Sequence, residues 1–139
     1  MALTTSVETA ETRVPITIVA LDGELDASNF EALEATVQEL YAGGARHLLL
    51  DLEQLRFMAS SGLVALHSIV RIMHGESADD AEAGWDALHQ VGLDAASGSA
   101  QREVQLCAPQ AAVQRVLART GLASMFVIHP DRATAIAAF

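Results

Sequence analysis

The chain has 139 residues, of which 51% are hydrophobic and 19% are charged, which suits one globular domain and excludes a disordered protein. Its formal net charge of −10 argues against nucleic acid and anionic membranes as partners, because both are bound through clustered Lys and Arg side chains. The apolar runs are too short to span a membrane, and no secretory signal is visible, so we expect a cytoplasmic protein without membrane insertion.

The first predicted elements are strands followed by a helix. Residues 14–21 are rich in β-branched side chains and predict a strand, and residues 3–10 could form one more strand beside it. The segment "DGELD" then interrupts the apolar run. Ser28 followed by Glu31 resembles a capping box, which predicts that a helix begins there and ends at the glycine pair starting with Gly43.

The middle of the chain predicts a buried strand, a second helix and a long insert. Residues 46–52 form a short continuous apolar run typical of a buried strand. Residues 75–102 are acidic and rich in small side chains, which indicates a surface insert between the second helix and the next strand, in which residues 81–93, including Trp85, could form a short helix. The second helix is predicted by apolar side chains at helical spacing: Leu63, Leu66, Ile69, Val70 and Met73.

The last third predicts two more strands, each followed by a helix. Residues 103–108 predict a strand that contains the single cysteine, Cys107, which we expect to be a small buried hydrophobic side chain. Pro109 suits the first turn of the next helix. Residues 124–129 predict another strand, and residues 130–139 a final short helix.

The order of these elements predicts an α/β fold for residues 1–139 as a single domain. Strands that alternate with helices form a sheet covered by helices, and strands joined through helices mostly run parallel. We therefore expect a four- to five-stranded, mostly parallel mixed sheet flanked by about four helices.

Two short polar segments follow strands of this sheet, "GELD" at residues 23–26 and "ASSG" at residues 59–62. They would lie at the same edge of the sheet, where sites of parallel α/β proteins gather. Each segment also has a purely structural interpretation. Ser60 or Ser61 could cap a helix, a contribution of about 1 kcal/mol, Gly62 could allow close packing, Gly23 could make a turn, and Asp26 could cap the first helix.

The sequence carries no constellation typical of an enzyme, a metal centre or a cofactor site. There is no phosphate-binding glycine loop, and "MASSGLV" lacks the G-x-S-x-G pattern of a nucleophile elbow. The five histidines lack the spacing of a metal pair. We expect no catalytic activity, no metal and no cofactor.

The segments "ALDGELDASNFEAL", "HLLLDLEQLRFMASSGLVAL" and "VQLCAPQAAVQRVLARTGLASMFVIH", in this order, resemble the STAS domain family, the bacterial anti-sigma factor antagonists. The resemblance covers residues 14–75 and 103–138. It implies a STAS fold whose second helix begins at the serines. It also implies a protein that binds an anti-sigma factor with serine kinase activity and thereby frees a sigma factor.

The resemblance further implies a phosphorylation switch. The phosphorylated serine of the family falls on Ser60, with Ser61 as the second choice, and a serine phosphatase would reverse the modification. The docking face would combine both polar segments with the exposed side of the helix at 61–74. The implied partner-binding residues are Gly23, Glu24, Asp26, Ala59, Ser60, Ser61 and Gly62.

The chain departs from the family pattern at two places. The family has Asp before the serine, where this chain has Ala59, so the fold could instead serve as a binding surface that is not phosphorylated. The insert at 75–102 could be a tolerated loop or an added contact anchored by Trp85.

Two other functions stay open: a STAS-type ligand-binding or sensory module, and an accessory subunit of a transporter complex. The sequence leaves the oligomeric state open.

Overall fold

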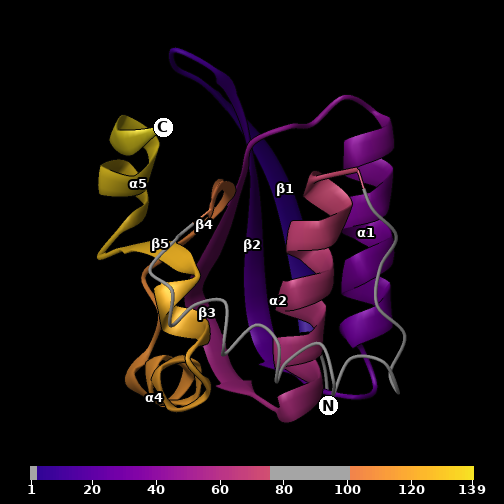
Figure 1. The fold of residues 1–139 in the computed structure, drawn as a ribbon, viewed down its shortest axis with the longest axis vertical. Helices are drawn as coiled ribbons and strands as arrows, with labels where there is room; N and C mark the ends of the chain where they lie inside the picture. The colour runs from indigo at the N-terminus through magenta and orange to yellow at the C-terminus, as the bar shows by residue number, and fades with distance from the viewer. Residues whose placement is uncertain (1–2, 76–100) are drawn as a thin grey trace.

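The computed structural model describes residues 3–75 and 101–139, which are built around one five-stranded sheet (Figure 1). The first strand is antiparallel to the second, and the second to fifth strands run parallel. This confirms the predicted α/β fold with a mostly parallel mixed sheet. The strands lie across the sheet in chain order: β1 (Leu3–Glu11), β2 (Pro15–Leu25), β3 (Leu48–Met58), β4 (Gln101–Cys107) and β5 (Phe126–His129).

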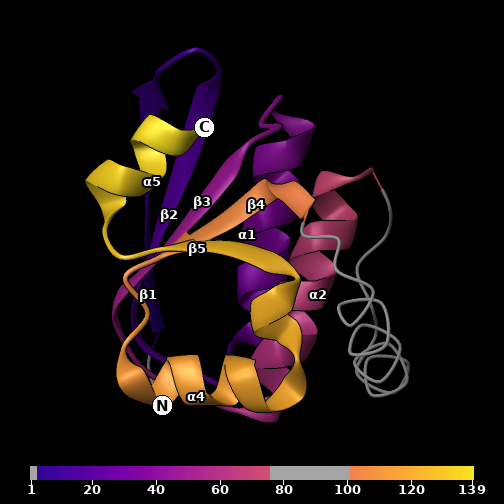
Figure 2. The same cartoon turned by 60° about the vertical axis from the view of Figure 1, so that its left-hand side comes forward.

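Helices cover both faces of this sheet. Successive parallel strands move across the sheet in one direction, so right-handed connections place their helices on one face. Figure 2 shows α1 and α2 on one side of the sheet and α5 on the other. The described helices are α1 (Phe30–Ala42), α2 (Ser60–Met73), α4 (Ala111–Thr120), the 3-10 helix η1 (Leu122–Ser124) and α5 (Arg132–Ala138).

The two faces of the sheet bury two separate apolar clusters. Alternate residues of β3, such as Leu50, join the inner sides of α1, α2 and α4 in the larger cluster. Leu49 points the other way, into a small cluster with Ile18, Cys107 and Ala135 of α5.

Burial, and then the nearby negative charge of Asp51, raise the pKa of the Cys107 thiol to about 12. Cys107 is therefore a buried, protonated side chain, as the sequence predicted.

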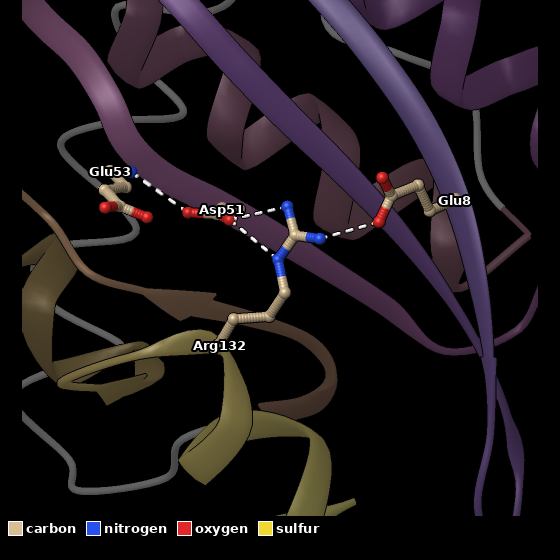
Figure 3. A network of polar contacts seen from close by, with 4 residues as sticks. All are labelled: Glu8, Asp51, Glu53 and Arg132. Carbon is tan, nitrogen blue, oxygen red and sulfur yellow. Dashed lines mark hydrogen bonds and ion pairs between the residues drawn. The ribbon is translucent and has the colours of Figure 1, made fainter.

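A polar network fastens α5 to its face of the sheet (Figure 3). The Nε and Nη2 atoms of Arg132 lie 2.9 and 2.8 Å from Oδ2 of Asp51, a buried carboxylate in the middle of β3. The Nη1 atom lies 2.6 Å from Oε2 of Glu8 in β1. The other oxygen of Asp51 accepts a 3.1 Å hydrogen bond from the backbone N–H of Glu53. One guanidinium thus joins the last helix to two strands.

The structure corrects the predicted start of the first helix. Helix α1 begins at Phe30 with Asn29 as its N-cap, and no side chain caps it. The predicted capping box at Ser28 is wrong, because the backbone N–H and the hydroxyl of Ser28 both donate to Oδ1 of Asp26. Asp26 does not cap the helix with its side chain either, since its carboxylate is engaged in this local turn.

Two strands also run further than predicted. Strand β2 continues through "DGEL" to Leu25 instead of stopping at residue 21, because a register shift at Gly23, with φ +122°, absorbs the irregularity. Gly23 therefore lies within a strand, opposite an irregularity at which β3 has one extra residue, and does not form a turn after the strand. Strand β3 continues to Met58. Of the predicted insert, Gln101 already belongs to β4, and the predicted helix at 81–93 with Trp85 lies outside the described residues.

Candidate functional site

The extended ends of β2 and β3 bring the two polar segments side by side. Glu24 pairs with Phe57 and Leu25 with Met58 in the parallel register. The backbone N–H of Ala59 then donates a 2.9 Å hydrogen bond to the carbonyl oxygen of Leu25. The "GELD" and "ASSG" segments thus form one continuous edge, as the order of strands predicted.

The turn after β2 is held by a residue that the sequence analysis missed, Asn29. Its Oδ1 accepts a 3.0 Å hydrogen bond from the backbone N–H of Asp26, and its Nδ2 donates one of 2.8 Å to the carbonyl oxygen of Glu24. The local signal was the run "DASN", since Asn and Asp side chains form turns with nearby backbone groups. Asn29 therefore fixes the direction in which the end of β2 presents its side chains.

Asp26 carries a negative charge in this turn at neutral pH. The hydrogen bonds from the hydroxyl and the backbone N–H of Ser28 lower the pKa of its carboxyl group below the usual 3.8. The oxygen-to-oxygen distance between the Ser28 hydroxyl and this carboxylate is 2.5 Å. Asp26 is half-buried and Ser28 is exposed, so the charge lies at the surface.

Helix α2 begins directly after β3 with an unusual N-terminus. Ala59 is its N-cap in an extended conformation, and no side chain makes a capping hydrogen bond. The prediction that Ser60 or Ser61 caps the helix is therefore wrong, because both serines are already helical residues. Ser60 is exposed and Ser61 is half-buried. The first turn carries no acidic side chain, so the positive end of the helix dipole is unopposed there.

Gly62 allows the helix to start this close to the sheet. A Cβ atom at this position would lie 2.6 Å from Cγ of Met58 and 3.1 Å from Cδ2 of Leu25. Both neighbours are fully buried members of the larger cluster. The predicted role of Gly62 in close packing is confirmed, and the packing joins the two polar segments through their apolar neighbours.

Helix α2 exposes fewer side chains around the serines than the sequence predicted. Ten of the fourteen residues of α2 are buried, so the predicted exposed side of the helix is reduced to Ser60, Ser61, His67 and Arg71. The sheet contributes an exposed side chain to this surface instead. Phe57, next to Glu24, has 43% of its surface exposed and is an aromatic side chain that the sequence analysis left out.

The described residues include no group of three or more His, Cys, Asp or Glu side chains that could hold a metal ion. None of the described helices is both long and apolar enough to cross a membrane.

His74, the C-cap residue of α2, contacts a carboxylate of β4. Its ring nitrogen Nε2 lies 3.1 Å from Oε2 of Glu103.

Solved structures of bacterial regulators share this fold. An anti-sigma factor antagonist from Mycobacterium paratuberculosis superposes with a TM-score of 0.67 at 22% identity, over 99% of this chain and 93% of the other. The anti-sigma factor antagonist SpoIIAA in its unphosphorylated form gives 0.64 at 22% identity, over 96% and 93%. The phosphorylated form of SpoIIAA from Bacillus gives 0.59 at 20% identity, over 97% and 98%.

The sequence itself carries the family signature in the region that builds this edge. Residues 8–76, which run from β1 to the end of α2, match the model of the STAS domain. This segment contains β2, β3, both polar segments and the start of α2. The chain therefore matches the STAS domain family over residues 8–76.

Proposed function

We propose that this protein is an anti-sigma factor antagonist, which binds an anti-sigma factor and thereby frees a sigma factor. One observation carries the proposal: the "GELD" segment and the N-terminus of α2 form a single continuous edge with Ser60 exposed, joined by the hydrogen bond between Ala59 and Leu25. Proteins described as anti-sigma factor antagonists have the same fold. The protein acts by binding, in the cytoplasm, without catalysis or a cofactor.

The docking surface has an acidic and an aromatic part. Glu24 and Asp26 supply negative charge at the end of β2, and Phe57 supplies the exposed aromatic ring beside them. Aromatic side chains are enriched among the residues that dominate binding energies at interfaces. Gly23 and Gly62 are buried, so they shape the surface without touching a partner. The matching partner surface is therefore an apolar pocket with a basic rim.

Ser60 is the proposed phosphorylation site, and its position explains how a phosphate could be tolerated. It is exposed in the first turn of α2, where free backbone N–H groups and the helix dipole favour an anion. Phosphorylation adds a charge of about −1.5 to −2 at neutral pH. The fold would persist, and the docking surface would change from mildly to strongly negative.

Ala59 makes this helix end more receptive to a phosphate. An Asp at this N-cap position would place its own carboxylate on the N-terminal N–H groups. With Ala59 the cap has no side-chain acceptor, so a phosphate on Ser60 would meet no competing carboxylate and one fewer neighbouring negative charge. The departure from the family pattern thus removes an acidic neighbour without removing the chemistry that stabilises the phosphoserine.

The proposed partners are an anti-sigma factor with serine kinase activity and a serine phosphatase. Incubation of the protein with its cognate anti-sigma factor and ATP should add one phosphate per chain, which peptide mass spectrometry should place on Ser60. The Ser60→Ala variant should take up none, and the matched Ser61→Ala variant should be phosphorylated normally. Undiminished phosphorylation of Ser60→Ala would refute the assignment, and loss in Ser61→Ala alone would move it to Ser61.

A further inference from the structure

The outer edge of β1 is a long, open strand. β1 lies at the end of the strand order, and among the described residues it pairs with β2 alone. Six of its nine residues are exposed and none is buried. Its outward backbone N–H and C=O groups therefore lie next to exposed side chains, where another strand could reach them.

This edge lacks most of the features by which proteins usually prevent strand addition. Natural edge strands are short, twisted by bulges, or carry Pro or charged side chains, especially Lys. β1 pairs with β2 without a register shift from Leu3 to Glu11, it contains no Pro, and the whole chain contains no Lys. The opposite edge, β5, is only four residues long. Val7, at the centre of β1, has 45% of its surface exposed, whereas Val19 beside it is fully buried.

The sequence of β1 is complementary to itself in one antiparallel register. If two copies pair about a two-fold axis at Val7, Val7 faces Val7, Thr5 faces Thr9 and Ser6 faces Glu8. The outer positions pair Thr4 with Ala10 and Leu3 with Glu11. No two acidic side chains face each other, and the pairs Val7–Val7 and Thr5–Thr9 on one face are β-branched, the type that stabilises cross-strand contacts.

The charge of Glu8 does not oppose this pairing. Its carboxylate is already bound by Arg132 of the same chain, at 2.6 Å (Figure 3). Glu11, at the end of the strand, is the other acid of β1, and the register places it opposite a leucine. The remaining repulsion comes from the net charge of −10 on each copy, which salt screens.

We propose that the free edge of β1 is a self-association surface, at which two copies of this chain pair antiparallel about Val7. The two sheets would then join into one sheet of ten strands. The proposal is independent of the proposed function, because it uses only the outer edge of β1 and the pairing is centred on Val7, whereas "GELD" meets β1 on its inner side, where Leu3 pairs with Gly23. The edge strand, its exposed valine and its self-complementary register are the observations that carry it.

Sedimentation velocity over a concentration series tests the association. The wild-type protein should form dimers whose fraction rises with protein concentration and with salt. Val7→Arg should weaken the dimer at least tenfold, because two cations would face each other on the axis. Gln114→Arg, at an exposed position on α4, is the matched control and should not change the dimer. Circular dichroism checks that both variants fold. A wild-type protein that stays monomeric throughout, or a Val7→Arg dimer of unchanged strength, would overturn the proposal.

Disulfide trapping tests the register. The native Cys107 is fully buried, so a substituted position supplies the accessible thiol. Oxidation of Val7→Cys should give covalent dimers, since directly opposite Cβ atoms lie roughly 4.5–5.5 Å apart. Thr9→Cys is the control: its two copies would be four residues out of register, roughly 14 Å apart at 3.4 Å per residue. Equal or faster trapping at position 9 would contradict the proposed pairing.

Discussion

Leu49 and Leu50 are adjacent residues of β3, both fully buried, yet they belong to different clusters. Leu50 lies on the helix face, where side chains from α1, α2 and α4 form one large apolar cluster. Leu49 lies on the α5 face, where five buried residues form a small one and the Asp51–Arg132–Glu8 network lies beside it. The comparison shows that one face is held by apolar burial and the other depends partly on charge.

This difference places the candidate site on the face that is held by the larger apolar cluster. Leu25, Met58 and Gly62 connect both polar segments to the large cluster on the helix face. A binding surface on packed elements is presented more precisely than one on loops. The scaffold of the proposed docking surface is therefore apolar packing, whereas the attachment of α5 also includes ion pairs.

The largest expected effect compares the two leucines directly. Leu→Ala substitutions in cores cost about 2–5 kcal/mol of unfolding free energy, depending on how far the site can collapse. The loss for Leu50→Ala should lie at the upper end of this range, because the other members of the large cluster hold its neighbours in place. Leu49→Ala should lie at the lower end, because α5 is short and can move inward. Urea denaturation of both variants measures the difference, and equal losses would contradict the contrast between the faces.

A smaller effect is expected from the ion pairs on the α5 face. Arg132→Ala would leave the buried Asp51 carboxylate without its cation, and we expect a loss of about 1–3 kcal/mol because Arg132 is partly exposed. Arg56→Ala is the matched control. Its pair with Asp22 is 3.5 Å long, with both side chains 61% exposed, so it should change stability by less than about 1 kcal/mol. Thermal unfolding of both variants tests this, and a loss for Arg56→Ala as large as that for Arg132→Ala would refute it.

The smallest effect concerns the cap of α5 and its pH dependence. Oδ1 of Asp131 accepts a 2.7 Å hydrogen bond from the backbone N–H of Thr134, which lowers the pKa of Asp131 below the usual 3.8. A lowered folded-state pKa stabilises the fold above pH 3.8, and the stabilisation is lost as the pH falls through the folded-state value. The melting temperature of Asp131→Ala should therefore be below that of the wild type at pH 7. The gap should shrink under pH 3.8, and a gap that stays constant to pH 2 would be inconsistent with this role.

Much of the fold could be predicted from the sequence because hydrophobic periodicity reports the local element directly. The apolar run at 46–52 and the helical spacing from Leu63 to Met73 gave a strand and a helix that the structure confirms. The ends of elements could not be predicted, because they depend on tertiary contacts. β2 passes through "DGEL" only because β3 pairs with it along a shifted register at Gly23.

The candidate site was predicted in position but not in detail. The order of strands placed "GELD" beside "ASSG", and the structure confirms this neighbourhood. The capping role of Ser28 was wrong because Asp26 competes for its hydroxyl. Asn29 and Phe57 were missed because a side-chain clamp and an exposed ring depend on where neighbouring elements lie, which a single sequence does not report.

The most direct test of the proposed docking surface is the affinity for the cognate anti-sigma factor, measured by isothermal titration calorimetry. Ser60→Asp, which puts a permanent charge beside the turn at Asp26, should weaken binding at least tenfold, or about 1.4 kcal/mol. The control, Ser124→Asp, changes an exposed serine just before β5, outside both polar segments, and should bind like the wild type. Unchanged affinity of Ser60→Asp, or equal losses in both variants, would contradict the proposal that the start of α2 forms the docking surface.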